Sequence, residues 1–316
     1  MSEFMNSKKT IYGVLNILTI LFLSVTTIAG ICSFDTSHSY EFVNQYGDTV
    51  KMWGSGIYAR DSYFKAPIFI GSDVTILLFV APLSIVAFLK TLKKQSVENY
   101  ICSFGLLSTL LYYSASLAFG VTYNILHLVY IALFGVCFFS ACMSLAKLHT
   151  VSVRQGQVCA YRFTKGMKIF LIATGISLFI AWLPDIITSI KNGTSLDLIE
   201  VYTTEITYVL DMGIISPLIF VTYYLVGKEN FMGYVLLRMI FKICMCIGVM
   251  LPVQTVFQLS AGISTPIPAL ITKVFIFVVM ALFAAYFEYR IKRETHYISS
   301  ESEYYSIGGV SKQSLL

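Results

Sequence analysis

The stretch TTEITYVLDMGIISP, residues 203–217, begins an apolar run that continues to Val226. About 20 predominantly apolar residues in a helix cross the ~30 Å hydrocarbon core of a bilayer, so 203–226 is predicted to be a membrane span. Two acids, Glu205 and Asp211, lie within it. A charged side chain at the middle of a span costs about 3 kcal/mol. A partner or a watery cavity is therefore expected beside Asp211, which lies ~12 Å from the start of the span.

Apolar runs of this kind recur along the whole chain. The sequence is 57% hydrophobic and 12% charged, whereas soluble domains carry about 25% charged residues. The runs are continuous and do not alternate with polar residues, which excludes the strands of a membrane β-barrel. The predicted fold class is an all-α membrane protein, a bundle of about eight transmembrane helices at 11–32, 68–90, 99–121, 124–147, 166–190, 203–226, 234–258 and 267–290.

Lysine and arginine are divided unequally between the two ends of these spans. One end has Lys8, Lys9, Lys90, Lys93, Lys94, Lys147, Arg154, Arg162, Lys165, Lys168, Lys228, Arg290, Lys292 and Arg293; the other has only Lys51, Arg60, Lys65 and Lys191. Cytoplasmic loops are enriched in these residues, so both termini are predicted to be cytoplasmic, in a protein of the cytoplasmic (inner) membrane. The net charge of +5 reflects this topology and does not indicate a nucleic-acid partner.

The pattern divides the chain into three regions. Residues 1–10 form a short cytoplasmic N-terminus, 11–294 the transmembrane helical domain, and 295–316 a Ser-rich cytoplasmic tail that is predicted to be disordered. The one substantial outer loop, 33–66, is expected to cap the bundle or to pack on the outer membrane surface through its aromatic residues, Trp53, Tyr58, Tyr63 and Phe64. No internal repeat is evident in the sequence.

Lys242 is the predicted partner of Asp211. Spans 203–226 and 234–258 form a hairpin, and the two side chains differ in depth by about five residues, or ~7 Å, which the aliphatic stem of a lysine can bridge. In the alternative, Arg238 and Lys242 mark the cytoplasmic edge of the span and extend to the headgroups; this interpretation is preferred for Arg238. Lys273, in the last span, is a further basic residue that could neutralise Asp211 or Asp73.

Asp73 and Asn124 are predicted to line the same outward-facing polar cavity as Asp211 and Lys242. Asp73, in GSDVTILLFVAP, lies ~8 Å below the outer boundary of span 68–90. It could instead be a helix-end carboxylate favoured by the helix dipole, and Asn124 could simply cap a helix. Pro217, six residues after Asp211, kinks the span; such breaks can expose carbonyls that coordinate a cation or a substrate.

Five sequence segments spread over most of the chain resemble those of a family of uncharacterised bacterial polytopic membrane proteins. The segments are GIYARDSYF, GSDVTILLFVAPL, YNILHLVYIALFG, TTEITYVLDMGIISP and MGYVLLRMIFKI. The resemblance adds Tyr58 and Asp61 of the outer loop to the candidate substrate-binding residues, which are then Tyr58, Asp61, Asp73, Asn124, Asp211 and Lys242. The family commonly has Gln where this chain has Ser72. The resemblance implies no particular activity.

Three classes of function fit these features. The preferred one is a permease-like or transport-associated protein whose outward cavity takes a small cationic or polar solute, with proton coupling through Asp211. The second is a membrane-embedded enzyme that acts on lipid-linked or surface substrates with Asp73 or Asp211 as acid or base, although the sequence offers no nucleophile. The third is a sensor or assembly partner that uses the 33–66 loop.

Cofactors and metals are not expected. The seven cysteines and four histidines form no metal-binding motif, and the chain has no glycine-rich nucleotide loop. The predicted partners are the lipids of the bilayer and the small solute.

Overall fold

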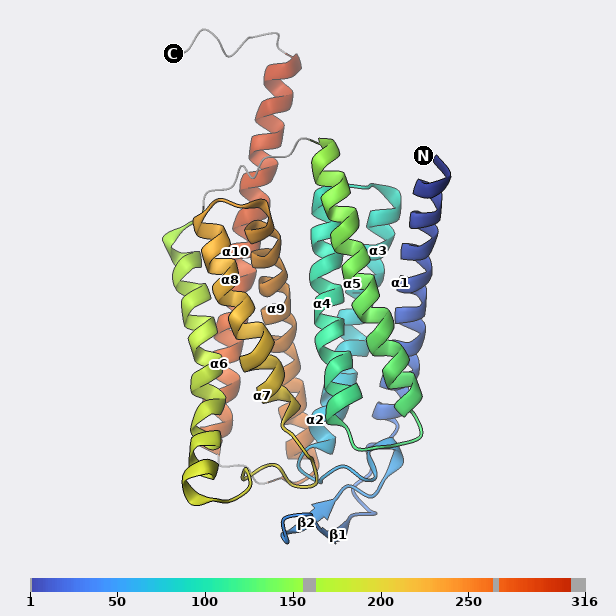
Figure 1. Ribbon diagram of the computed structural model, residues 1–316, viewed down its shortest axis with the longest axis vertical. Helices are drawn as coiled ribbons and strands as arrows, with labels where there is room; N and C mark the ends of the chain where they lie inside the picture. Colours follow the sequence, from blue (N-terminus) through green and yellow to red (C-terminus); the bar gives the residue numbers. More distant parts are fainter. Residues whose placement is uncertain (1, 156–162, 264–266, 308–316) are drawn as a thin grey trace.

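The computed structural model describes residues 2–155, 163–263 and 267–307, and it is an all-α bundle (Figure 1). Within the described residues, eight helices are long and apolar enough to cross a membrane: Thr10–Ile31, Ala66–Lys93, Val97–Gly120, His127–Arg154, Lys165–Asn192, Ile206–Gly227, Phe231–Ser260 and Val274–Glu294. Each of them overlaps one predicted span. The predicted fold class is confirmed.

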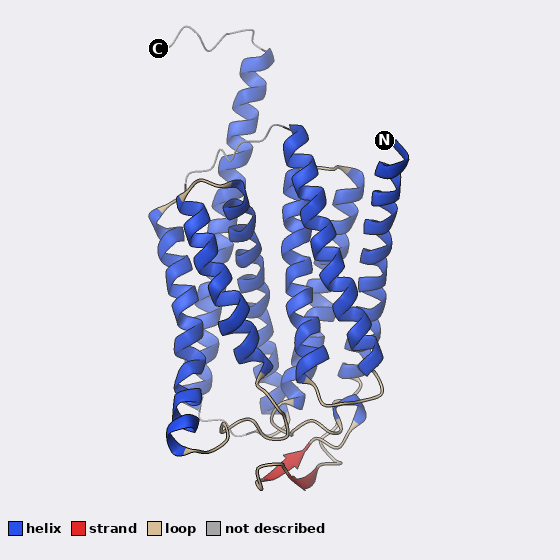
Figure 2. Ribbon diagram, in the orientation of Figure 1, coloured by secondary structure: helices blue, strands red, loops and turns tan. Residues whose placement is uncertain are grey.

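Some of these spans consist of more than one element. In chain order the elements are α1 (Ser2–Ile31), β1 (Tyr40–Val43), β2 (Thr49–Met52), η1 (Gly56–Tyr58), α2 (Ala66–Thr75), η2 (Ile76–Val80), α3 (Ala81–Lys93), α4 (Val97–Gly120), α5 (His127–Gln155), α6 (Lys165–Asn192), α7 (Ile206–Leu210), η3 (Asp211–Ile215), α8 (Ser216–Gly227), α9 (Phe231–Ser260) and α10 (Ile267–Ile307). The second span is α2, η2 and α3, and the sixth is α7, η3 and α8. Figure 2 shows β1 and β2 as a small antiparallel hairpin beyond one end of the helices.

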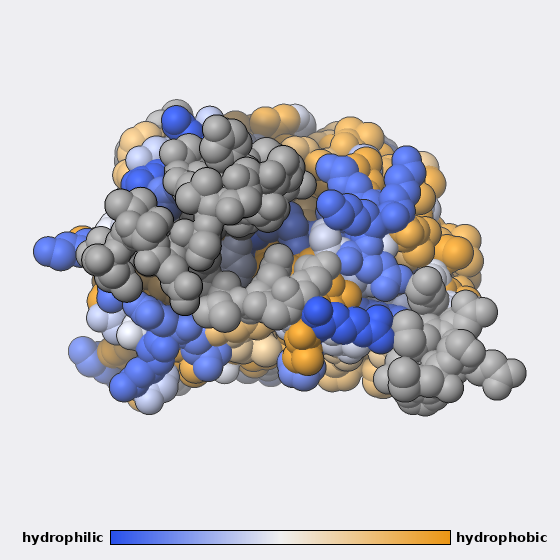
Figure 3. Space-filling model, turned by 90° about the horizontal axis from the view of Figure 1, so that it is seen from above, coloured by the Kyte–Doolittle hydropathy of each residue, from blue (hydrophilic) through white to orange (hydrophobic). Residues whose placement is uncertain are grey.

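Consecutive spans run in opposite directions, so the connections alternate between the two ends of the bundle. The N-terminus and the last turns of α10 lie at one end, here called the basic end, and β1 and β2 at the other, the hairpin end (Figure 1). Figure 3, viewed onto the basic end, shows several groups of hydrophilic side chains on this face and hydrophobic ones along much of its right edge. Helix α10 continues to Ile307, past residue 294, where the disordered tail was expected to begin.

The bundle consists of two halves of four spans each, α1–α5 and α6–α10 (Figure 1). In both halves the last two spans pack along each other, α4 with α5 and α9 with α10, and the first span packs on the second, α1 on α2 and α6 on α8. The halves meet where α9 packs on α2 and α4. A repeat absent from the sequence is thus present in the arrangement of the spans.

The second span of each half contains a π-helical turn followed by a proline. These turns are η2 (Ile76–Val80) and η3 (Asp211–Ile215), and Pro82 and Pro217 follow them at the same distance. Proline lacks an N–H donor and its ring clashes with the carbonyl one turn earlier. The wider π turn accommodates this clash and often lies at functional sites. The kink predicted near Pro217 is therefore a π turn, and it begins at Asp211.

The two halves differ in how tightly they close. Helix α1 packs along α5, whereas α6 touches α10 at few points. Two of these points are Gly166 beside Phe287 and Thr174 beside Met280, both in the part of α6 nearer the basic end. Within the described residues, α6 and α10 therefore contact each other less than α1 and α5 do.

Candidate functional site

A cavity of about 380 Å³ lies in the second half of the bundle. Side chains of α6, α7, η3, α8, α9 and α10 line it, and α2 and α4 of the first half contribute to its wall. The polar and aromatic-polar residues of the lining are Lys65, Ser72, Tyr112, Tyr113, Ser116, Thr174, Ser177, Trp182, Thr204, Glu205, Thr207, Tyr208, Asp211, Gln254, Thr255 and Gln258. Most of the remaining lining residues are isoleucine, leucine, phenylalanine and methionine.

The cavity is elongated along the axis of the bundle. On α9 its lining extends from Gln258, near the hairpin end, to Met239, a length of ~28 Å at the helical rise per residue. The polar residues of α9 in this wall, Gln254, Thr255 and Gln258, lie near the hairpin end. Toward the basic end the α9 wall is almost wholly apolar: Met239, Ile240, Ile243, Cys244, Ile247, Met250 and Leu251.

Asp211 lies in the wall of this cavity, with its side chain fixed by two neutral donors. The indole Nε1 of Trp182 donates to Oδ2 (2.9 Å), and the hydroxyl of Tyr112 donates to Oδ1 (2.9 Å). Trp182 in turn stacks on Tyr208, with ring centroids 4.7 Å apart. Asp211 is only 6% exposed and has no ion-pair partner within the described part of the chain; the side chain of Lys273 lies outside that part.

The predicted pair of Asp211 and Lys242 is wrong. The Nζ atom of Lys242 instead lies 2.8 Å from Oε1 of Glu288 on α10. On its other side, the aliphatic part of Lys242 packs on Gly105 of α4, where an added Cβ would lie 2.3 Å from the lysine Cδ. The sequence gives the depth of Lys242 and Asp211 within two neighbouring spans, but not the direction of either side chain around its helix. Lys242 points toward α4 and α10 and away from the cavity.

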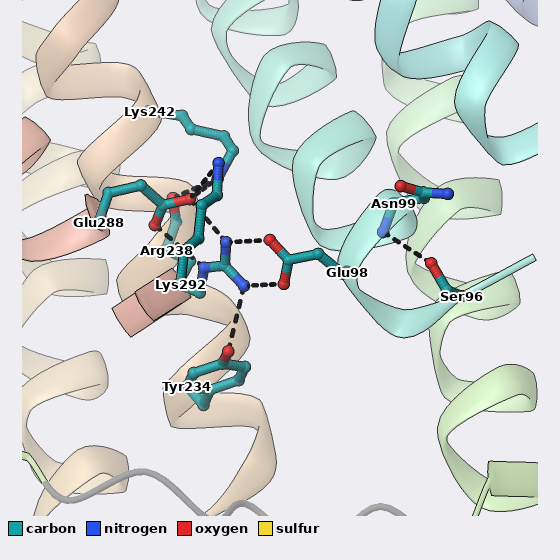
Figure 4. A network of polar contacts seen from close by, with 8 residues as sticks. All are labelled: Ser96, Glu98, Asn99, Tyr234, Arg238, Lys242, Glu288 and Lys292. Atoms are coloured by element: carbon teal, nitrogen blue, oxygen red, sulfur yellow. Dashed lines mark hydrogen bonds and ion pairs between the residues drawn. The ribbon is translucent and has the colours of Figure 1, made fainter. Parts of the chain in front are cut away.

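The sequence suggested that Arg238 extends to the headgroups. In the structure its side chain is instead fully buried. Its Nε and Nη2 donate to Glu288 at 3.0 and 2.7 Å, Nη2 also donates to Glu98 of α4 at 2.5 Å, and Nη1 forms a second bond with Glu98. Figure 4 shows Arg238 between the two carboxylates, with Tyr234 and Lys292 beside them. Together with Lys242 these groups form the basic-end ion cluster, which ties α4 to α9 and α10.

Glu98 and Glu288, like the Trp182 and Tyr112 that hold Asp211, are not among the residues predicted from the sequence. Glu288 lies inside the predicted span 267–290 and Glu98 one residue before the predicted start of its span. A buried arginine requires acidic partners. The sequence signal was that Glu98 and Glu288 lie at the same end of their spans as Arg238. The cluster sets the buried cations Arg238 and Lys242, together with the exposed Lys292, against these two carboxylates.

Asp73 does not line the cavity but is sealed in the first half of the bundle. It is fully buried, and it accepts hydrogen bonds from the hydroxyls of Tyr58 (2.7 Å) and Tyr113. Gly30 of α1 lies so close that an added Cβ would be 1.7 Å from an oxygen of Asp73. The prediction that Asp73 and Asp211 line one cavity is wrong, because Asp73 joins α1, α2, α4 and the outer loop.

Asn124 is also absent from the cavity lining. Its Oδ1 accepts from the backbone N–H of Leu126 (2.9 Å), and its Nδ2 donates to the hydroxyl of Tyr130 (3.3 Å). The side chain thus shapes the turn that precedes α5, in line with the structural alternative for this residue.

Asp61 belongs to a cluster that joins the two halves at the hairpin end. Its Oδ1 accepts from the backbone N–H of Thr122 (2.9 Å) and the hydroxyl of Tyr202 (3.0 Å). Beside it, Ser62 donates to Glu200, and Lys65 pairs with Glu205. These contacts, here called the hairpin-end latch, hold the loop between α1 and α2 to the loop before α7, beside the end of the cavity.

Burial changes the pKa values of the latch residues. It raises the pKa of Asp61 to about 7, against an opposing effect of the hydrogen bonds from Thr122 and Tyr202. It also lowers the pKa of Lys65 to about 8 and raises the pKa of Glu200. Asp61 therefore holds a proton to higher pH in the fold than in the unfolded chain.

Comparison of the chain with protein-family models, with curated proteins and with solved structures finds no match. The bacterial family suggested by the sequence segments therefore stays a prediction. The eight long apolar helices of the described residues are those of an integral multi-pass membrane protein.

Proposed function

We propose that the protein is permease-like and that its cavity receives the positively charged group of a small solute at Asp211. One observation carries this proposal. Asp211 is a buried carboxylate in a cavity wall, and its hydrogen-bond partners among the described residues, Trp182 and Tyr112, are both neutral. By contrast, the buried cations Arg238 and Lys242 are paired with carboxylates.

The surroundings of Asp211 suit a cation. A carboxylate within a membrane span is costly unless a proton or a positive charge neutralises it, and an incoming cation supplies that charge. The rings of Trp182 and Tyr208 lie beside the carboxylate, and aromatic faces attract ammonium groups through cation–π interactions. The π turn that begins at Asp211 resembles the helix breaks from which transporters build their sites near the bilayer midplane.

Polar contacts between the halves lie toward both ends of the cavity. The hairpin-end latch joins Lys65, just before α2, to Glu205, just before α7, and the basic-end ion cluster joins α4 to α9. In many transporters one half rocks against the other and opens one end at a time. The two clusters lie where such a motion would break contacts. In this proposal the hairpin end faces outward, as the distribution of lysine and arginine predicts.

Uptake into proteoliposomes tests the proposal. We would measure accumulation of radiolabelled methylammonium, tetramethylammonium and choline, with 3,3-dimethylbutan-1-ol as the neutral isostere of choline. At least one cation should accumulate above protein-free liposomes, and Asp211→Asn should abolish this accumulation.

Asp185→Asn is the matched control. Asp185 accepts a hydrogen bond from Tyr208 (2.7 Å) but does not line the cavity, so this variant should retain uptake. Failure of all three cations to accumulate, or full uptake by a correctly folded Asp211→Asn protein, would contradict the proposal.

A further inference from the structure

We infer that the solute is amphipathic, with a cationic head at Asp211 and an unbranched apolar chain that extends along α9 toward the basic end. The position of the head rests on the proposed function. The apolar chain is an additional inference, and it follows from the shape, lining and opening of the cavity.

The shape of the cavity suits a chain. From Gln254 to Met239 the lining of α9 covers ~22 Å. An extended chain can lie along this length of the helix, whereas a compact solute would contact only part of it.

The lining of the cavity beyond Asp211 is apolar. Ile215 and Leu218 of the sixth span line this part of the cavity together with Ile240, Ile243 and Ile247 of α9. A polar solute would lose hydrogen bonds to water here without regaining them, whereas each buried methylene is stabilised by its removal from water. The lining therefore selects an apolar chain.

One lining residue of the cavity is also exposed at the outer surface of α10. Ile276 lines the cavity and is nevertheless 46% exposed, and the neighbouring Phe275 is 63% exposed. Among the described residues, α6 and α10 make few contacts, unlike the corresponding α1 and α5 of the first half. In this inference the chain enters from the bilayer, between α6 and α10, as well as from the hairpin end.

Fluorescence of Trp182 provides the test. It is one of only two tryptophans; it lies in the cavity wall against Asp211, whereas Trp53 is buried in the outer loop. Trimethylammonium ions with alkyl chains of two to eight carbons would be titrated against the protein in nanodiscs. We expect the Kd to fall with each methylene by up to about fourfold, which corresponds to ~0.8 kcal/mol per buried methylene.

Ile247→Phe, which narrows the apolar part of the cavity, should remove this dependence for the longer chains. Val249→Phe is the matched control, since Val249 lies on the same helix but is exposed and outside the lining. Leu218→Phe narrows the cavity from the opposite side and replaces Ile247→Phe if that variant does not fold. A Kd that does not depend on chain length, or a dependence unchanged in both narrowed variants, would overturn the inference.

The same titration separates this inference from the proposed function. If tetramethylammonium binds in an Asp211-dependent manner but longer chains add nothing, the inference fails and the proposed function stands. If the Kd falls with chain length but is the same for Asp211→Asn and the unmodified protein, the proposed site for the head fails and the apolar chain site stands.

Nanodiscs of phosphatidylcholine with brominated chains identify the source of the chain. Bromine near Trp182 quenches its fluorescence. If an added alkyltrimethylammonium relieves the quenching, it has displaced the chain of a bilayer lipid; without relief, the occupant is a water-soluble amphiphile.

Discussion

The basic-end ion cluster makes a quantitative prediction about Glu288. Its carboxylate accepts three hydrogen bonds from two cations, at 3.0 and 2.7 Å from Arg238 and 2.8 Å from Lys242, and its side chain is 6% exposed. Glu288→Gln keeps the shape of the side chain but removes the charge. Arg238 and Lys242 would then share the one remaining acid of the pair, Glu98, whose side chain is 45% exposed.

The expected loss is large because two buried cations become undercompensated. Removing one partner of a buried ion pair costs about 3–5 kcal/mol, so Glu288→Gln should lower the free energy of unfolding by about 4 kcal/mol. Lys242→Met leaves Glu288 paired with Arg238 and should cost about 2 kcal/mol. The double variant Glu288→Gln/Lys242→Met lacks both the carboxylate and the lysine that its loss would leave unpaired. Its loss in unfolding free energy should therefore be smaller than the ~6 kcal/mol sum of the two single losses by at least about 2 kcal/mol.

Unfolding by SDS in mixed micelles, followed by circular dichroism, measures these free energies. Glu294→Gln is the matched control, because Glu294 forms an exposed pair with Arg290 one turn away on the same helix. Such pairs contribute about 0.5 kcal/mol or less. A loss for Glu288→Gln no larger than for Glu294→Gln, or single losses that add in the double variant, would refute this account of the cluster.

Two further predictions concern the first half of the bundle and the hairpin-end latch. Gly30→Ala forces Asp73 from its position and should lower the free energy of unfolding by about 1–3 kcal/mol in the same assay. Gly13→Ala, where nothing lies within 4 Å of an added Cβ, should not destabilise the protein. Equal losses for the two variants would contradict the close approach of Gly30 to Asp73. Because the pKa of Asp61 is raised from 3.8 to about 7 in the fold, its contribution favours folding fully below about pH 4 and is lost as the pH rises to about 7, a difference of about 4 kcal/mol. Asp61→Asn should therefore flatten the fall in thermal stability between pH 4 and pH 8. A pH profile unchanged by this substitution would contradict a raised pKa of Asp61.

The sequence predicts the spans well because each one depends on local composition. Residues 203–226 and 234–258 are predominantly apolar irrespective of what the rest of the chain contains, and bilayer thickness fixes their length. Pro217 likewise marks a break that local backbone chemistry requires. The repeat of the two halves cannot be seen in the sequence. The halves share the arrangement of their spans and a π turn in the second span, but not the identity of their residues.

Side-chain partners are harder to predict because they depend on how each helix is rotated. Lys242 and Asp211 lie on neighbouring spans, yet the partner of Lys242 is Glu288 on α10. Asp73 and Asp211 both follow the outer start of a span that contains a π turn, yet one is sealed by Gly30 and the other lines a cavity. Depth along the chain could be estimated from the sequence, but the direction of each side chain around its helix could not.

The central claim, that a cation binds beside Asp211, is tested most directly by protection of a single cysteine in the cavity. Ser116 lines the cavity on α4, one turn from Tyr112. In a protein whose seven native cysteines are replaced, we would measure the rate at which a water-soluble thiol reagent modifies Ser116→Cys, with and without butyltrimethylammonium. The account predicts that the cation slows modification, that Asp211→Asn abolishes this protection, and that Asp185→Asn preserves it. Equal rates with and without the cation, or protection that survives Asp211→Asn, would contradict it.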